Sequence, residues 1–375
     1  MRTLVRACKG HSRSLWLRHA RVMGRAILIA LWGMGGLLAC RGEMPPAIRG
    51  QAWPEANQLF RQDPNWLGGD GAYSVHLGNE RVLWQFGDSF VRTPSQNGSY
   101  MVRNSVAVQT GLDPTYAFLR FYWKQRDGHP SSFLPEVGEY WYWPNHGIRL
   151  EDKLLLFYGR LYQASSGKWG FRYVDWTAFL VDNPDDEPSA WRIREAKVPP
   201  DEHDVQLATA VWREGDVLYL MGGEFNRAPM GIHLARVDCA EAQNGDLTGL
   251  VWWTGEGWGP RSQRQAVIDF GAPELSVHFS ATLGKYVMVQ TAGAGATTLA
   301  VRTAAHPEGP WSDLRDVLRP PESYYDDTFV YAGKGHPELQ GADLIATYVP
   351  TLKDDRHSAE DDSYYHPYFA KLIFP

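Results

Sequence analysis

The sequence contains little cysteine. Among 375 residues only Cys8, Cys40 and Cys239 are cysteines, and the first two belong to an N-terminal segment that has the features of an export signal. The one that remains, Cys239, cannot form an internal disulfide, and no zinc-site spacing exists. The domain must therefore be held together by its hydrophobic core, and about 325 residues are enough to bury a large one.

Clustered positive charge is missing from most of the chain. Lys and Arg number 37 and Asp and Glu number 43, but the first 39 residues contain seven of the cations and no acid. The remainder has 30 cations against 43 acids, a net charge of −13. Because phosphate binding requires clustered Lys and Arg, this balance argues against a nucleic-acid partner.

The uncharged run of residues 26–39 is too short to span a bilayer comfortably. It follows a cationic stretch and ends in Leu37-Leu38-Ala39-Cys40, which resembles a bacterial lipobox. We expect residues 1–39 to be a lipoprotein signal peptide, Cys40 to carry lipid, and residues 40–51 to be a tether. The protein would then be anchored in the cell envelope, outside the cytoplasm. A signal cleaved elsewhere and a plain anchor helix are alternatives, and Met23 is a possible start.

Helical periodicity is scarce after Trp66, whereas aromatic residues make up 13% of the chain. One pattern recurs five times: a strand with some polar residues, a tight turn and a strongly apolar strand. It occurs in residues 68–88, 142–160, 204–223, 273–291 and 326–350. Four strands per repeat at this spacing predict an all-β fold, a five-bladed β-propeller over residues 52–375. A two-sheet sandwich is the alternative, but sandwiches seldom reach this length as one domain.

The first hairpin contains two candidate catalytic acids, Asp70 and Asp88. If the loop is Gly78-Asn79-Glu80, the residue numbers of any two paired residues add up to 158. Asp70 then faces Asp88 directly across the strands. Repulsion would raise the pKa of one carboxyl and leave its partner ionised, as acid–base catalysis requires. Alternatively, Asp70 belongs to a Gly-Asp-Gly turn and Asp88 merely ends a strand.

In a propeller the first strand of each blade lines the central funnel, so polar residues there are candidates for binding substrate. Glu274 is a third candidate acid, kept in reserve. The candidates for substrate binding are Asn145, His146, His278, Asp327, His336 and Trp143. Individually such residues more often satisfy hydrogen bonds within the fold. His278 or His336 could ligate a central cation, but the spacing does not support a metal site, and no cofactor is predicted.

Several segments resemble the family named domain of unknown function 4185. They are WLGGDGAYSVHLGNERVLWQFGDSFV (66–91), WPNHGIRLEDKLLLFY (143–158), PELSVHFSATLGKYVMV (273–289), EGPWSD (308–313) and YAGKGHPEL (331–339). That family includes endo-acting D-arabinofuranosidases of glycoside hydrolase family 183. The resemblance implies a five-bladed propeller whose paired aspartates match Asp70 and Asp88.

Together these observations predict a lipid-anchored glycoside hydrolase that cleaves a furanosidic, arabinan-like polysaccharide with a pair of carboxylates. A non-catalytic glycan-binding propeller would explain the aromatic content and the anchor equally well. A metal-dependent hydrolase is a third class and would need several acids and histidines around one ion.

Overall fold

The computed structural model describes residues 47–92, 98–166, 170–200, 204–293, 295–325, 327–352 and 364–375. The predicted signal peptide and Cys40 lie outside these residues. Within the described part of the chain, no helix is both long and apolar enough to cross a membrane.

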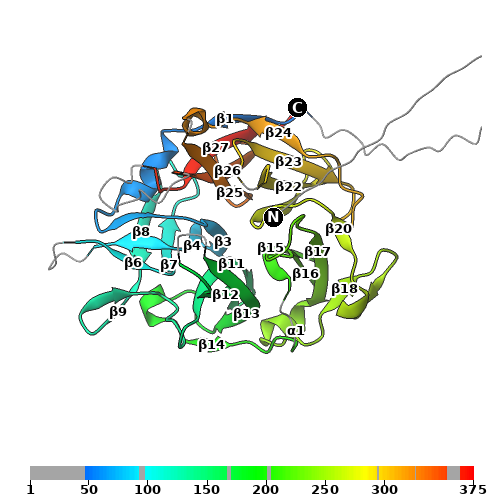
Figure 1. Ribbon diagram of the computed structural model, residues 1–375, viewed down its shortest axis with the longest axis horizontal. Helices are drawn as coiled ribbons and strands as arrows, with labels where there is room; N and C mark the ends of the chain where they lie inside the picture. Colours follow the sequence, from blue (N-terminus) through cyan, green and yellow to red (C-terminus); the bar gives the residue numbers. More distant parts are fainter. Residues whose placement is uncertain are drawn as a thin grey trace, which may run out of the picture. The chain divides into compact units, whose positions relative to one another are not determined.

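Nearly all regular structure is β-strand, which confirms the all-β class. The largest sheets follow one another around a common centre, as in a β-propeller (Figure 1). From the centre outward, the first contains β3 (Tyr73–Gly78), β4 (Arg81–Phe86), β7 (Ser105–Thr110) and β8 (Phe118–Tyr122). The second contains β11 (Trp141–Leu150), β12 (Lys153–Gln163), β13 (Phe171–Val181) and β14 (Ile193–Glu195).

The third sheet contains β15 (Gln206–Glu214), β16 (Val217–Gly223), β17 (Ile232–Asp238), β18 (Val251–Trp253) and β19 (Trp258–Gly259), with β20 (Ala266–Ile268) beside β17. The fourth contains β21 (Leu275–Ser280), β22 (Lys285–Thr291), β23 (Leu299–Ala304) and β24 (Arg315–Leu318). The fifth contains β25 (Thr328–His336), β26 (Leu344–Leu352), β27 (Tyr368–Ile373) and β1 (Arg49–Ala52).

The remaining elements are small. One additional sheet contains β2 (Trp66–Gly69), β5 (Ser89–Val91) and β6 (Tyr100–Val102), and another pairs β9 (Lys124–Arg126) with β10 (His129–Ser131). The helical segments are η1 (Ala56–Arg61), η2 (Pro188–Ala190), α1 (Cys239–Gln243), η3 (Arg261–Gln263) and η4 (Pro321–Tyr324).

The five predicted hairpins form the two innermost strands of the five larger sheets. In the first, Asn79 and Glu80 make the turn with φ of 52° and 55°, the left-handed pair that suits the twist of a hairpin. Leu77 is an extra residue between the pairs His76–Val82 and Gly78–Arg81. The bulge compensates for the two-residue turn, so Tyr73 to His76 keep the predicted pairing sum of 158.

The core consists of apolar layers between neighbouring sheets. Leu83 and Val106 of the first sheet pack with Leu156 of the second, and Phe157 of the second packs with Leu220 of the third. Equivalent clusters join the third sheet to the fourth, the fourth to the fifth, and the fifth back to the first. The alternation of side chains along each strand thus buries both faces of every sheet.

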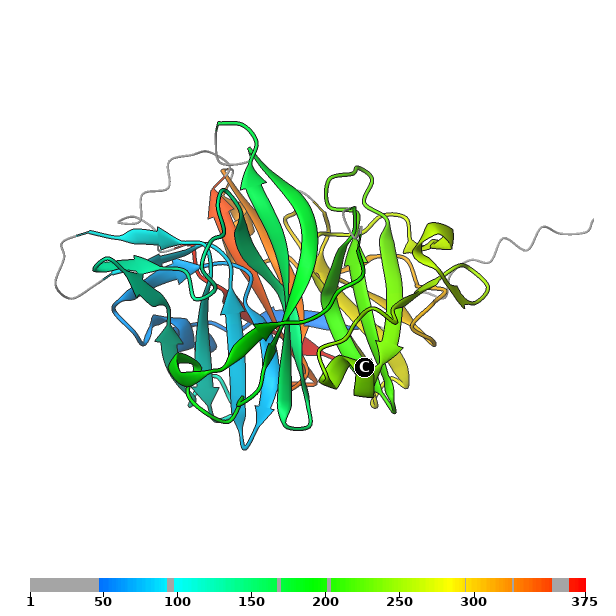
Figure 2. The ribbon, with the colours of Figure 1, turned by 90° about the horizontal axis from the view of Figure 1, so that it is seen from below.

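Arg49 to Gln51, which we expected in the tether, lie in β1 and pair with Lys371 to Ile373 of β27. The first described strand therefore completes the last sheet. In the view of Figure 2, the long strands run between two ends of the domain, where the connecting loops gather.

Candidate active site

One cavity of about 200 Å³, which we call the acid cavity, is lined by Asp70, Asp88 and Glu274. The five innermost strands begin at this end of the domain. The cavity has aromatic walls, made by Trp141, Trp143, Phe171, Phe225, Tyr331 and Tyr365. Acids from the first and fourth sheets thus share a small, largely apolar space, which is the usual character of a small-molecule site.

Asp70 and Asp88 lie between two ladders, both of which keep the predicted pairing sum of 158, but no ladder pair joins the two aspartates directly. The strands β2 and β5 pair Gly69 with Ser89, whereas the β3–β4 ladder begins only at Tyr73. Between them, Gly71 and Ala72 adopt φ of 82° and 53°, which turns the chain out of the ladder. The backbone oxygen of Asp70 still accepts a 3.0 Å hydrogen bond from the Gly87 N–H.

The Asp70 carboxyl is half-buried and accepts a 2.8 Å hydrogen bond from the Tyr331 hydroxyl. Burial, followed by the negative charges of Asp88 and Glu274, raises the pKa of Asp70 to about 7. The hydroxyls of Tyr331 and Tyr365 partly oppose this rise. At neutral pH Asp70 is therefore protonated about half of the time, and it can donate a proton.

Asp88 has a different environment, because a cation and an indole N–H contact it. Arg103 Nη1 lies 3.1 Å from Asp88 Oδ2, and Trp143 Nε1 donates to Oδ1 at 2.9 Å. Burial raises the pKa of Asp88, whereas Arg103 and Trp143 oppose the rise. The Arg103 guanidinium also lies over the Trp141 ring, 4.2 Å from its centroid, which fixes the cation in place.

Glu274 is paired with a buried lysine. Lys334 Nζ lies 3.1 Å from Glu274 Oε1 and also donates to the backbone oxygens of Gly71 and Ala332. The ammonium sits 4.1 Å from the centroid of the Tyr73 ring. Burial lowers the pKa of Lys334, and the carboxylate of Glu274 opposes that change. This network ties together segments of the first, fourth and fifth sheets beside Asp70.

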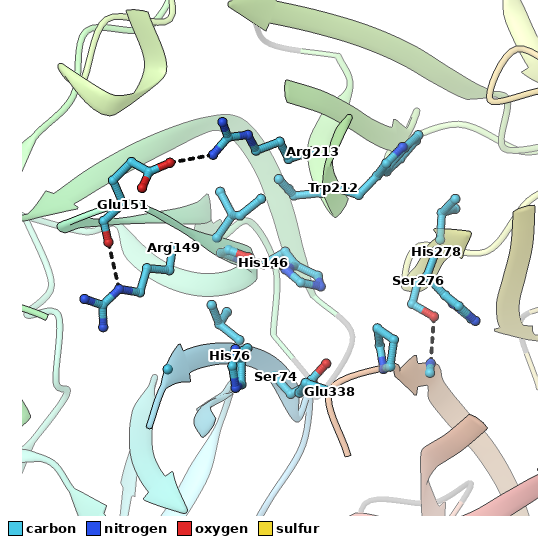
Figure 3. A pocket seen from close by; sticks show the side chains of 18 residues that line it. Ser74, His76, His146, Arg149, Glu151, Trp212, Arg213, Ser276, His278 and Glu338 are labelled. Atoms are coloured by element: carbon cyan, nitrogen blue, oxygen red, sulfur yellow. Dashed lines mark hydrogen bonds and ion pairs between the residues drawn. The ribbon is translucent and has the colours of Figure 1, made fainter. Parts of the chain in front are cut away.

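The predicted binding residues divide into three groups. Trp143 lines the acid cavity, whereas His146 and His278 line a second cavity of about 480 Å³ (Figure 3). Asn145 and His336 are fully buried and hydrogen-bonded within the core, to Leu207 and Gln206 and to Ser74 and Thr347 respectively. Asp327 is exposed and lines neither cavity.

Position along the strand explains the division. On β11, Trp143 is near the start of the strand and His146 lies further along it. In the fourth sheet, Glu274 precedes β21, whereas His278 lies inside this strand. Residues a few positions apart on an inner strand therefore face different ends of the domain. The sequence predicts which strands are inner, but it does not predict at which depth each side chain reaches a cavity.

Several residues of the site escaped the sequence analysis, chiefly Arg103, Tyr331, Lys334 and Tyr365. Arg103 follows β6 on the outer side of the first hairpin, and the other three come from the fifth sheet or the segment before β27. One signal existed for Lys334, since a lysine in an otherwise apolar and glycine-rich strand requires a charged partner. In the described ranges, no three His, Cys, Asp or Glu side chains are grouped so that they could hold a metal.

Comparison with known families identifies the relatives of this fold. The family called domain of unknown function DUF5005 matches residues 55–373. The chain belongs to the DUF5005 family. The resemblance to domain of unknown function 4185 was therefore wrong, and the connection to glycoside hydrolase family 183 is withdrawn with it. No curated protein matches this DUF5005 chain.

Solved structures with similar folds exist despite low sequence identity. A Bacteroides ovatus protein provisionally called a hydrolase is 18% identical, with a TM-score of 0.67 over 87% of this chain and 90% of that one. At this identity the likeness shows a shared fold. A family 43 β-xylosidase/α-arabinofuranosidase from a compost metagenome, in complex with xylotriose, is 15% identical (TM-score 0.48; 87% and 94% covered). The Podospora anserina α-L-arabinofuranosidase, in complex with cellotriose, is 11% identical (TM-score 0.45; 88% and 96% covered).

Proposed function

We propose that this DUF5005 protein is a glycoside hydrolase in which Asp70 is the general acid and Asp88 is the ionised partner. The observation that supports this proposal is that two acids of one cavity have different partners, although burial raises the pKa of both. Two tyrosine hydroxyls and two neighbouring carboxyls contact or face Asp70, whereas Asp88 has an ion pair with Arg103. Acids whose surroundings separate their pKa values are the pattern expected for acid–base roles.

In this mechanism the Asp70 carboxyl donates its proton to the glycosidic oxygen as the bond to the anomeric carbon breaks. Asp88 either takes a proton from a water molecule as that water attacks the anomeric carbon, or attacks this carbon itself and forms a glycosyl ester that water then hydrolyses with Asp70 as the base. Glu274 pairs with Lys334, and its proximity to Asp70 contributes to raising the pKa of Asp70. The aromatic walls exclude water and offer flat surfaces for sugar rings.

The finer parts of the proposal concern the substrate, the location and the number of blades. We propose a furanosidic, arabinan-like polysaccharide as substrate and a location outside the cytoplasm, with lipid on Cys40. We also propose that the five larger sheets correspond to five blades. The sequence features of the N-terminus support the location, the sheet order supports the number of blades, and the aromatic walls of the cavity support a sugar substrate. Each part can fail without the others.

The test is hydrolysis of arabinan, arabinogalactan and xylan by the purified protein, beside matched aryl glycosides with a good leaving group. We expect Asp70→Asn to lose about 10²–10⁴-fold in activity on polysaccharides, the usual contribution of a general acid. The same variant should retain much of its activity on aryl glycosides, which need little protonation. Asp88→Asn should be inactive on both substrate types.

Asn65→Asp serves as a control that changes an amide to an acid outside the cavity and should leave hydrolysis intact. Full activity of folded Asp70→Asn and Asp88→Asn would overturn the assignment and direct attention to Glu274. The Asp88–Arg103 ion pair is the one observation that favours a glycan-binding protein. Binding of these polymers without any hydrolysis would establish that second function instead.

A further inference from the structure

The second cavity lies where the inner strands end, and it is larger than the acid cavity. It has a volume of about 480 Å³ and receives residues from all five innermost strands or their ends (Figure 3). Its mouth is open, since His76, Arg213 and Pro337 are exposed. This volume lies within the range of small-molecule sites, about 300–1,000 Å³.

Two polar atoms in this cavity have no hydrogen-bond partner among the described residues. They are Nδ1 of His278, a side chain that is 9% exposed, and Oε1 of Glu338. Buried polar atoms are satisfied in nearly all native proteins, so each requires a partner that enters from the cavity. They come from the fourth and fifth sheets, and His146 of the second sheet also faces the cavity (Figure 3).

The interior of the cavity disfavours charge. Burial lowers the pKa of both His146 and His278 to about 4, so both rings are neutral at pH 7. Burial also raises the pKa of Glu338. The two arginines of the lining already have ion pairs at the rim, Arg213 with Glu151 at 2.9 Å and Arg149 with Asp185 at 2.7 Å. An anionic ligand would lose its hydration here without meeting an unpaired cation.

The chemistry that fits is a neutral molecule with several hydroxyl groups. A hydroxyl can donate to a carboxyl oxygen or an imidazole nitrogen and can accept from either group. Val75, Ile148, Val211 and Val277 supply apolar contacts for the C–H faces of such a molecule. We propose that this cavity is a second binding site, separate from the acid cavity, for a neutral monosaccharide or polyol held by His278, Glu338 and His146.

The test measures binding of D-xylose, L-arabinose, D-galactose and myo-inositol by calorimetry and by NMR of the histidine side chains. D-Glucuronate, D-glucosamine and calcium are the charged probes. We expect at least one neutral probe to bind with a Kd of about 1 mM or tighter and to shift the imidazole signals of His146 and His278. The NMR measurement uses the unaltered protein, so it does not depend on the folding of a variant.

Variants then separate the two cavities. We expect His278→Gln and Glu338→Gln to weaken binding of that probe about tenfold, as loss of a buried hydrogen bond would. Asp70→Asn should bind it as the unaltered protein does, which also keeps this site independent of the proposed hydrolase. If none of the neutral probes binds at about 100 mM, the cavity holds only water and the proposal is overturned. Preferred binding of a charged probe, or binding lost only in Asp70→Asn, would also overturn it.

Discussion

Asp70 connects the chemistry of the acid cavity to the stability of the fold. Its pKa rises from an ordinary 3.8 to about 7 in the folded protein. A carboxyl with the higher pKa in the folded state binds its proton more tightly there. Its contribution to the free energy of unfolding is therefore complete below pH 4 and is lost as the pH rises through about 7.

Asp70→Asn should remove this loss, because asparagine has no proton to release. We expect the variant to have a higher Tm than the unaltered protein at pH 8 and a smaller difference at pH 5. The gain at pH 8 should be about 2–4 °C for each kcal/mol recovered. Thermal unfolding at both pH values measures it, and equal Tm differences at pH 5 and pH 8 would contradict the assignment of the raised pKa.

Arg103 controls the charge of Asp88, and Trp141 holds Arg103. Arg103→Gln removes the cation that opposes the rise in the pKa of Asp88. The acidic limb of the pH profile of kcat/KM should then move to higher pH. At pH 6 we expect a loss of about tenfold, or about 1.4 kcal/mol of transition-state stabilisation.

Arg120→Gln is the matched control for Arg103→Gln, since Arg120 has an exposed ion pair with Glu187 at 3.8 Å. This control should have an unchanged profile. A fall in kcat/KM for Arg103→Gln that is uniform across pH would mean that the arginine binds substrate and does not set the charge of Asp88.

At the scale of elements, the junction between the β2–β5 and β3–β4 ladders places both aspartates. Gly87 lies in this junction, and a Cβ added there would be 2.4 Å from Asp70 Oδ1. Gly87→Ala should therefore displace the carboxyl and break its bond to Tyr331. We expect about a 10²-fold loss of kcat/KM, as for other misplaced catalytic groups, with little change in Tm.

Gly257→Ala is the control for Gly87→Ala, because a Cβ at Gly257 has no described atom within 4 Å. It should retain both activity and stability. If Gly87→Ala loses stability and activity in parallel, the glycine serves the fold and not the position of the acid.

The hairpins themselves could be predicted, because alternating apolar residues and a left-handed turn are local signals. The β3–β4 register followed from them, and the bulge at Leu77 happened to preserve it. The departure at Gly71 and Ala72 was not predictable, since it depends on a second ladder between β2 and β5. Tyr331 was missed for a related reason, since its contact with Asp70 exists only after the fifth sheet meets the first. Arg103 was missed because its contact with Asp88 depends on the β5–β6 ladder, which pairs the neighbouring residues Ser89 and Val102.

At the scale of the whole molecule, β1 completes the fifth sheet beside β27. A chain that begins at Trp53 lacks β1 and leaves the edge of β27 unpaired, whereas a chain that begins at Ala47 retains it. We expect the shorter chain to unfold at a temperature lower by about 5 °C or more and to aggregate through its open edge. Thermal unfolding and light scattering of the two chains measure this, and equal Tm values would show that β1 adds no stability.

The same pairing affects the order of events during synthesis. Of the described strands, β1 (Arg49–Ala52) is made first, yet its partners in β27 follow more than three hundred residues later. The fifth sheet, and with it the packing between the fifth sheet and the first, can form only when the chain is almost complete. Long-range pairing of this kind is slow, and the edge of β26 stays unpaired until β27 has been made. The last step of folding thus joins the two ends of the domain, and a chaperone that shields the unfinished ring would act before that step.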